Sequence, residues 1–426
     1  MLDINLIRED PELVRRNLER RGAEDKIALL EELLKLDARR RKLITEANQL
    51  KNRRNVLSQE VSKLKKEGKD IAPVVEEVKD IPRRIKVLDE DIRKCEEGVR
   101  YRLLRLPNLL HESVPVGANE EDNRVVRTWG DRGEFGFQPK DHIDLSLDLG
   151  LADIERAARA SGARFYYLKD ELVLLNYALI KFALDILRDK GFILYQPPYM
   201  LRRKGVESAT DLADFEEMIY KVEGEDLYLI PTSEHALLAL HLGEILDGNE
   251  LPIRYGGVSP CFRKEAGAHG RDTKGIFRVH QFEKVEQFVY SKPEEAWSEH
   301  EKLISNAEGV LQRLGIPYRV VNVCTGDIGT VAAKKYDLEA WLPGQGKYRE
   351  VVSCSNCTDY QARRANIRFR DNPREPTRFV HTLNSTLIAS ERTLIAVMEN
   401  YQGEDGSIEV PKALLPYMNG IEAIER

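Results

Sequence analysis

The chain has 426 residues, of which 42% are hydrophobic and 32% charged, and its formal net charge is −6. This length exceeds what one hydrophobic core usually organises, so more than one domain is expected. No apolar run approaches the roughly 18 residues of a membrane-spanning helix, and no cationic segment followed by an apolar one opens the chain. We therefore expect a soluble, cytoplasmic protein with no membrane role, and the net charge weighs against a protein that coats nucleic acid over its whole surface.

Apolar residues recur with heptad spacing in the first hundred residues. One series comprises Leu36, Leu43, Leu50, Leu57 and Leu64, and a second steps through Ile71, Val74, Val78, Ile81, Ile85, Leu88, Ile92, Cys95 and Val99. Such spacing is typical of a coiled-coil seam. Gly68 separates the two series and Pro73 suits a first helical turn, so an antiparallel helical hairpin is predicted. Pro82 lies inside the second series and should kink or locally open that helix.

The first helix of this hairpin is strongly basic. Between Lys35 and Lys69 there are twelve lysines and arginines against four aspartates and glutamates, a local charge of 12 − 4 = +8. A helix of about 40 residues is roughly 60 Å long, so most of the hairpin is expected to project into solvent. Charge on a solvated helix often serves only solubility, but this asymmetry favours a phosphate-binding arm.

After Pro107 the heptads stop, and mixed helical and strand-like segments follow. We place a domain boundary at residue 110, with an arm over 1–110 and an α+β domain over 111–426. Strands are predicted at 227–230 and 287–290, and helices over 172–190 and 296–314. Neither a G-x-x-x-x-G-K-[ST] loop nor a G-x-G-x-x-G signature occurs, so any nucleotide must be held in another way.

The stretch over 261–288 offers such a way. It places Phe262-Arg263-Lys264-Glu265 and Arg278-Val279-His280-Gln281-Phe282 on either side of a loop with glycines at 267, 270 and 275. Alternation in both flanks predicts two antiparallel strands, one face of which would present Arg263, Glu265, Arg278, Phe282 and Glu286. Arginine neutralises phosphate, an aromatic ring stacks on a base and carboxylates accept from amines. For an isolated Arg-x-Glu, a surface hairpin with ordinary ion pairs would be the better explanation.

The whole stretch resembles motif 2 of the class II aminoacyl-tRNA synthetases in its seryl-specific form. Lys190-Gly191-Phe192 leading to Pro198 resembles motif 1, Thr232-Ser233-Glu234 resembles the family's serine-binding T-x-E, and residues 350–357, followed by Arg363-Arg364, resemble its metal and ATP segment. Residues 382–392 resemble motif 3, without its usual glycines and with Thr386 where serine is common. The resemblance covers essentially the whole chain. It implies a class II antiparallel sheet flanked by helices, preceded by the coiled-coil hairpin, and a homodimer built on motif 1.

The resemblance also implies roles for individual residues. The serine site would comprise Thr232, Ser233, Glu234, Arg263, Glu286 and Thr386. The ATP site would comprise Arg263, Lys264, Glu265, Arg278, Val279, Phe282, Glu350, Val351, Val352, Ser353 and Arg392. Glu350 and Ser353 would hold Mg²⁺ with ATP, and the catalytic groups would be Arg263, Arg392 and Glu350. Contacts to tRNA would come from Arg39, Arg40, Lys51, Arg53, Arg54, Lys63 and Lys65 of the arm and from Arg271 and Lys274.

The implied reaction has two steps. L-serine attacks the α-phosphate of ATP to give seryl-adenylate, and the 3′-hydroxyl of tRNA(Ser), with tRNA(Sec) as a further candidate, then takes the serine. Arginines would neutralise the two anions of the first step. In the second step, orientation of the two reactants would supply most of the rate acceleration. Two alternatives stay open: a synthetase-like paralogue that aminoacylates a carrier protein, against which the basic arm weighs, and a non-catalytic RNA-binding or coiled-coil relative.

Overall fold

The computed structural model describes residues 1–210, 218–266, 272 and 274–426. It divides into two units, Leu2–Pro107 and Asn108–Arg426, with Met1 belonging to the second. Among the described residues no helix is both long and apolar enough to cross a membrane.

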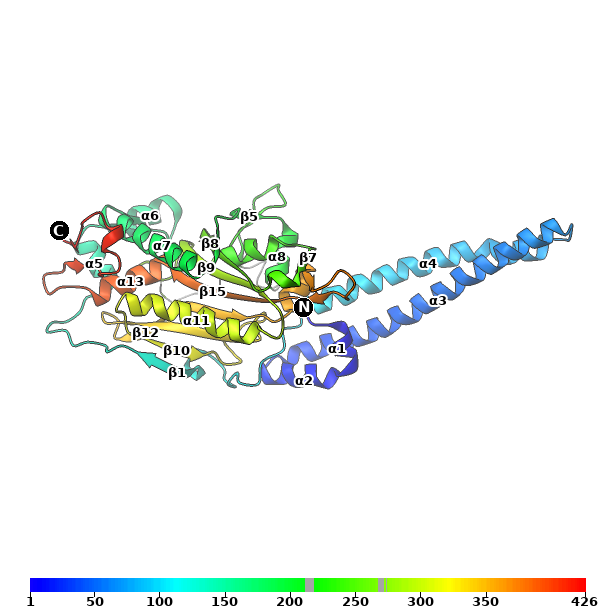
Figure 1. The fold of residues 1–426 in the computed structure, drawn as a ribbon, viewed down its shortest axis with the longest axis horizontal. Helices are drawn as coiled ribbons and strands as arrows, with labels where there is room; N and C mark the ends of the chain where they lie inside the picture. Colours follow the sequence, from blue (N-terminus) through cyan, green and yellow to red (C-terminus); the bar gives the residue numbers. More distant parts are fainter. Residues whose placement is uncertain (211–217, 267–271, 273) are drawn as a thin grey trace. The chain divides into compact units, whose positions relative to one another are not determined.

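The first unit is entirely helical. Asp10 caps α2 by accepting from the Leu13 N–H, and Pro11 occupies the first turn of that helix, where its missing N–H costs nothing. The elements are α1 (Ile4–Glu9), α2 (Pro11–Arg20), a 3₁₀ turn η1 (Glu24–Lys26), α3 (Ile27–Lys66) and α4 (Ala72–Leu103). Helices α3 and α4 lie side by side as the predicted antiparallel hairpin (Figure 1).

The heptad positions form the seam between α3 and α4. Leu57, Ile81 and Ile85 are buried together, with Leu50 and Val74 packed against them. Gly68 turns the chain with a φ of +67°, which a residue with a side chain rarely adopts. The α4 helix runs without a break through Pro82, so the expected local opening was wrong. Its neighbours Ile81 and Ile85 are held in the seam, and this packing offsets the hydrogen bond that proline cannot make.

The second unit is built around an eight-stranded sheet. Its strand order is β1 (Arg124–Trp129), β10 (Tyr318–Asn322), β11 (Lys334–Leu342), β12 (Lys347–Asn356), β15 (His381–Ala389), β9 (Gln281–Ser291), β8 (Ile253–Phe262) and β4 (Ile193–Tyr195). Neighbouring strands are antiparallel except at one edge, where β4 runs parallel to β8. The antiparallel sheet that was expected is therefore mixed at its edge.

Helices α7 (Glu171–Asp189), α11 (Ala296–Arg313) and α13 (Ser390–Asn400) pack against this sheet (Figure 1). The bounds of α7 and α11 match the helices predicted from periodicity to within one residue at each end. The other helices are α5 (His142–Asp148), α6 (Ile154–Ser161), α8 (Arg203–Ala209), α10 (Ser233–Ala239), α12 (Tyr360–Ala365) and the 3₁₀ turns η2 (Glu120–Asp122), η3 (Gly248–Glu250) and η4 (Leu415–Tyr417).

Four small sheets complete the unit. They are β14 (Arg378–Phe379) with β13 (Arg368–Arg370) and β7 (Ile245–Asp247), β16 (Ile408–Glu409) with β17 (Ala423–Ile424), β2 (Ala152–Asp153) with β3 (Tyr167–Leu168), and β5 (Met200–Leu201) with β6 (Tyr228–Leu229). The two predicted strands correspond to β6 and to part of β9.

The motif 2 stretch differs from its prediction in one respect. Strand β8 ends at Phe262 and β9 begins at Gln281, so Arg263, Glu265 and Arg278 lie beyond the strands. Pairing continues for one step, because the Arg263 N–H donates to the His280 carbonyl at 2.9 Å. Glu265 then turns away with a φ of +51°, which an extended strand does not contain.

Candidate active site

One face of the central sheet carries a polar cavity of about 270 Å³. Side chains alternate along a strand, so residues two apart share a face. Phe282, Lys284 and Glu286 of β9, Asn384 and Thr386 of β15, and Ser353 and Ser355 of β12 all line the cavity. The intervening residues face α11: the Gln287 amide, for example, donates to the Leu303 carbonyl at 3.1 Å. The cavity and α11 therefore lie on opposite faces.

Two β-bulges widen the set of side chains that reach this cavity. The register of β12 shifts between Leu338 and Glu339 of its partner strand, which leaves Val351 as the extra residue. The register of β15 shifts in the same way at Leu387. The extra residue interrupts the alternation, so residues three apart across each bulge share a face: Glu350 lines the cavity with Ser353, and Ala389 lines it with Thr386.

The wall opposite the bulges is the start of α10. Thr232 is the N-cap residue of this helix, and its hydroxyl accepts from the Glu234 N–H at 3.2 Å. This short polar cap fixes the first turn and places both Thr232 and Glu234 in the lining.

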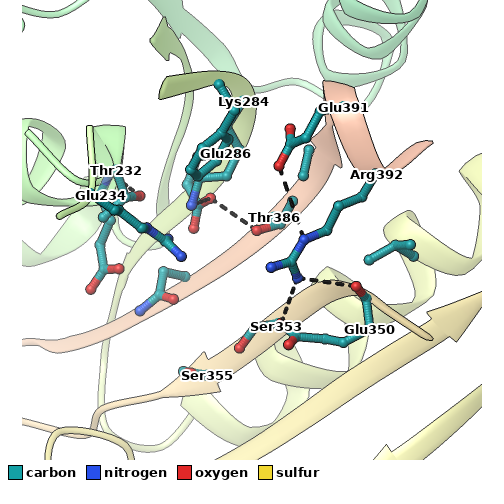
Figure 2. A pocket seen from close by; sticks show the side chains of 15 residues that line it. Thr232, Glu234, Lys284, Glu286, Glu350, Ser353, Ser355, Thr386, Glu391 and Arg392 are labelled. Atoms are coloured by element: carbon teal, nitrogen blue, oxygen red, sulfur yellow. Dashed lines mark hydrogen bonds and ion pairs between the residues drawn. The ribbon is translucent and has the colours of Figure 1, made fainter. Parts of the chain in front are cut away.

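A buried ion pair forms the floor of the cavity. The Lys284 ammonium lies 2.5 Å from Glu286 Oε2, and the two side chains are 7% and 2% exposed. The Thr386 hydroxyl donates to the same carboxylate oxygen at 3.4 Å (Figure 2). Both contacts engage Oε2, so Oε1 of Glu286 is left for other donors.

Two arginines stand at the cavity wall. The Arg263 guanidinium lies over the Phe282 ring at 5.1 Å from its centroid, and its Nε donates to the Pro231 carbonyl. Arg392, in the first turn of α13, donates to the Glu350 carbonyl at 3.0 Å and lies 3.4 Å from the Glu350 carboxylate (Figure 2). The cavity thus combines two fixed guanidinium groups with an aromatic ring.

A second cavity of about 510 Å³ adjoins the first and shares Glu350 and Arg392 with it. Four arginines and a lysine line this second cavity together with five acidic residues, and Arg278 and Arg349 are among the arginines. Asp272 lies 2.6 Å from Arg349, and Glu265 lies 2.9 Å from Arg278, so acidic residues hold both guanidinium groups in place. The adjoining cavities offer room for a small polar molecule beside a larger anionic one.

Burial perturbs the carboxylates of the first cavity. Burial, together with the nearby Glu286, raises the pKa of Glu234 to about 7. Burial likewise raises the pKa of Glu391 to about 7. Burial also acts on Glu350, but Arg392 and Lys335 outweigh it and keep the pKa of that carboxyl below its usual value. Perturbed groups gathered in one cleft are typical of an active site.

We expect Glu234→Gln to stabilise the protein at pH 8 by roughly 1 to 3 kcal/mol, because burying the charged form costs free energy. The raised pKa means that the folded state holds this proton more tightly than the unfolded state. Stability is therefore lost as pH rises from about 4.5 to about 7, and the glutamine does not incur this loss. Thermal melts of both proteins at pH 4.5 and pH 8 measure the effect, and a gain of equal size at both values would contradict it.

The donor set at Glu350 and Ser353 suits a hard divalent cation. Both residues line the first cavity with oxygen ligands, which Mg²⁺ prefers. The described residues contain no group of three or more His, Cys, Asp or Glu side chains arranged to hold a metal ion. Any Mg²⁺ held here would therefore take most of its ligands from water or from a bound phosphate.

Comparison with known proteins agrees with this geometry. Residues 1–110 match the model of the seryl-tRNA synthetase N-terminal domain, and residues 218–401 match that of the class II tRNA synthetase core domain for G, H, P, S and T. The serine–tRNA ligase of Pyrococcus horikoshii is 54% identical, with 98% of this chain and 96% of that protein covered. The chain belongs to the seryl-tRNA synthetase family.

Solved structures of seryl-tRNA synthetases have the same fold. The P. horikoshii enzyme complexed with ATP superimposes with a TM-score of 0.96 and covers 100% of this chain and 99% of its own. The cytoplasmic serine–tRNA ligase of Naegleria fowleri, in complex with AMP, is 38% identical and gives 0.90 with the same coverage.

Most residues that the resemblance assigned to seryl-tRNA synthetase sites come together in the structure. The first cavity is lined by Thr232, Glu234, Arg263, Phe282, Glu286, Glu350, Val351, Ser353, Thr386 and Arg392. Arg278 lines the second. The arm residues Arg39, Arg40, Lys51, Arg53, Arg54, Lys63 and Lys65 all lie on α3. Lys274 is exposed, and Arg271 lies outside the described residues.

A few assigned residues lie outside the linings of these two cavities. Ser233 is fully buried, and its hydroxyl points to the Gly257 carbonyl at 3.3 Å. Lys264 lies near the Tyr220 ring, Glu265 is paired with Arg278, and Val279 and Val352 are buried in the hydrophobic core. Only the backbones of these two valines remain available for a ligand.

Other lining residues had no site role assigned from the sequence. In the first cavity they are Lys284, Ser355, Asn384, Ala389 and Glu391, and in the second they are Glu120, Glu121, Asp272, Phe277, Arg319, Glu339, Lys347, Tyr348 and Arg349. Strand alternation from Phe282 to Glu286 was a sufficient signal for Lys284. Ala389 and Glu391 depend on the bulge and on the start of α13, for which the sequence carries no comparable signal.

Proposed function

We propose that this chain activates L-serine with ATP to form seryl-adenylate and then transfers the serine to the 3′ end of tRNA(Ser). The observation that carries the proposal is the pair of adjoining cavities: the smaller one sets carboxylates beside two arginines and a lysine, and the larger one contains four arginines and a lysine among its acidic residues. A zwitterionic amino acid fits the first and a polyphosphate fits the second.

Serine is recognised by its ammonium and hydroxyl groups. The Glu234 carboxylate accepts from the ammonium, and Glu286 with Thr386 reads the hydroxyl from the floor of the cavity. These polar groups are buried, so alanine or glycine would leave them without partners, and such a mismatch is penalised far more than a missing methylene. Thr232 holds the backbone of Glu234 in place, because its hydroxyl accepts from the Glu234 N–H at the start of α10.

Activation is an in-line displacement between two anions, which is slow unless charge is neutralised. Arg263 bridges the serine carboxylate and the α-phosphate, and Arg392 holds the far phosphates. Phe282 stacks on the adenine ring. Glu350 and Ser353 would hold Mg²⁺, which when bound would neutralise phosphate charge. No protein nucleophile takes part in this step.

The second step needs orientation more than further chemistry. The 3′-hydroxyl of the tRNA attacks the adenylate carbonyl, and holding the two reactants in place supplies most of the acceleration. The basic residues of α3 bind the phosphate backbone of the RNA, and Lys274 and Arg271 contact the acceptor end. In this proposal residues 1–110 form the tRNA-binding arm and residues 111–426 the catalytic domain.

Serine-dependent exchange of pyrophosphate into ATP tests the proposal. We expect exchange with L-serine and ATP, and charging of tRNA(Ser), with tRNA(Sec) assayed beside it. A carrier-protein ligase would exchange without charging tRNA, and a non-catalytic RNA-binding relative would not exchange at all. Either result would replace the proposal.

We also propose a homodimer. Large apolar side chains are exposed on α7 and in the stretch after it that resembles motif 1: Leu174 and Tyr177 on α7, and Ile193 and Leu194 after it, are 39% to 58% exposed. An isologous contact between two such faces is the commonest oligomeric solution. We expect light scattering to give twice the 48.8 kDa chain mass at micromolar concentration, and a fully active monomer would contradict this.

The cytoplasm is the proposed location. All five cysteines, at positions 95, 261, 324, 354 and 357, are free and buried. Free thiols are usual in reducing compartments, whereas secreted proteins tend to pair them.

A further inference from the structure

Gln361 is a fully buried residue of α12 that lies behind the first cavity. Its amide nitrogen donates to the Ala209 carbonyl at 3.0 Å and to Glu234 Oε1 at 2.7 Å. Its amide oxygen accepts from the Thr382 hydroxyl at 2.7 Å. The Ala209 carbonyl can only accept, which fixes the orientation of the amide, so both N–H groups are used and Glu234 must present an acceptor oxygen.

The Glu234 side chain has room to leave the first cavity. It also lines a third cavity of about 220 Å³, together with His235, Thr330 and Cys357. The Thr232 hydroxyl accepts from the backbone N–H of Glu234 and, among the described residues, does not hold its carboxylate. Within the described part of the chain, Gln361 is the one hydrogen-bond donor to the Glu234 carboxylate.

We propose that Gln361 is a positioning residue for serine binding: it holds Glu234 Oε1 and thereby keeps the carboxylate directed to the first cavity. The inference rests on the proposed function, in which Glu234 accepts from the serine ammonium. Gln361 is absent from the lining of that cavity, so it acts only through Glu234.

Thr382 extends this support to the strand that carries the substrate-facing residues. It is fully buried on β15, four residues before Thr386. The Thr382 hydroxyl holds the Gln361 amide, and the amide holds Glu234. The position of Glu234 is therefore coupled to β15, the strand that carries Thr386. Thr382→Val removes the hydroxyl at nearly constant shape, whereas Thr382→Ser retains it.

Steady-state serine-dependent ATP–pyrophosphate exchange on the full-length protein tests this inference. Gln361→Met should raise the KM for serine roughly tenfold to a hundredfold, as expected when a hydrogen bond to a charged group is lost. The kcat and the KM for ATP should stay within about twofold, because the lost contact serves ground-state binding of serine alone. Thr382→Val should raise the serine KM by a smaller factor, and Thr382→Ser should restore it.

Gln402→Met is the matched control. Gln402 is also buried and makes three hydrogen bonds, to the Lys140 N–H and to the carbonyls of Lys140 and Glu399, but it does not line the cavity. An unchanged serine KM in Gln361→Met, or an equal rise in Gln402→Met, would overturn the inference. If Gln361→Met does not fold, equal serine KM values for Thr382→Val and Thr382→Ser would overturn it instead. Absence of serine-dependent exchange in the unmodified protein would refute the proposed function itself, a separate outcome.

Discussion

Glu286→Gln should lower kcat/KM for serine in ATP–pyrophosphate exchange by roughly a hundredfold to a thousandfold, the loss expected when one charged partner leaves a buried site. Glu286 is 1% exposed, and it lies beside Lys284 at the floor of the first cavity. The glutamine keeps the shape and a hydrogen bond to Thr386, but it removes the charge. ATP binding should change little, because the proposed ATP contacts lie on Arg263, Arg278 and Arg392.

The glutamine is preferable to alanine for this test. Alanine would leave the buried Lys284 without its partner, which costs about 3 to 5 kcal/mol of folding free energy and confuses stability with activity. Glu299→Gln is the matched control: Glu299 is 2% exposed and paired with Arg254 at 2.8 Å and Lys302 at 2.7 Å on the opposite face of the sheet. Near-normal serine activation in Glu286→Gln would show that Glu286 is only a strand-face charge and that the serine site is elsewhere.

Features set by local periodicity were predictable from the sequence. The hairpin seam repeats every three or four residues over two long helices, so every predicted core position in α4 is buried or half-buried. Gly68 and Pro73 marked the reversal for local steric reasons. The motif resemblance then predicted that Arg263, Glu286, Glu350 and Arg392, which are far apart in the chain, share one site, and all four line one cavity.

Features set by tertiary registration were not predictable. Glu350 and Ser353 are three residues apart, and simple alternation would place them on opposite faces of β12. The extra residue at Val351 reverses this expectation, and it depends on the register of the neighbouring strand β11. The end of β8 before Arg263 and the positive φ of Glu265 depend in the same way on contacts that no local pattern encodes.

The ion pairs of the arm also depend on tertiary contacts that the sequence does not show. Seven basic residues of α3 were expected to contact RNA, and nothing in the sequence ranked them. The structure pairs Lys51 with Asp89 at 3.0 Å and Arg53 with Glu77 at 2.7 Å, whereas Arg54, Lys63 and Lys65 are exposed and make no ion pair with any described residue. The second group is therefore the stronger candidate for phosphate contacts.

Replacing residues 48–88 with a short glycine-rich turn should spare serine-dependent exchange but lower tRNA charging by at least a hundredfold. The removed part of the hairpin packs on itself, through Leu57, Ile81 and Ile85, so its loss does not open the core of the catalytic unit. The cut leaves Asp37 in place, which is 1% exposed and paired with Arg8 at 2.6 Å, so the attachment of α1 to the base of α3 survives. Exchange and charging, measured on the same preparation, separate the two steps.

A triple charge reversal provides the finer version of this experiment. Arg54, Lys63 and Lys65 changed to glutamate should weaken tRNA binding without altering exchange. Each lost phosphate contact should also reduce the slope of log K against log salt by about one unit. Reversal of Lys79, Arg83 and Lys86, which are exposed on α4, changes the net charge of the arm by the same amount and serves as the control.

The comparison between the two triple variants decides how the arm works. Net charge acts at long range and is screened beyond roughly 10 Å at 0.1 M salt, so both variants should lose similar affinity if the arm only attracts RNA. If α3 instead makes a fixed set of phosphate contacts, the α3 variant should lose far more tRNA affinity than the α4 variant. The number of counterions released on binding then depends on which residues contact phosphate and not on the total charge. We expect the second result. If the truncated protein charges tRNA as well as the intact one, the hairpin serves another partner, and only the catalytic half of the proposed function stands.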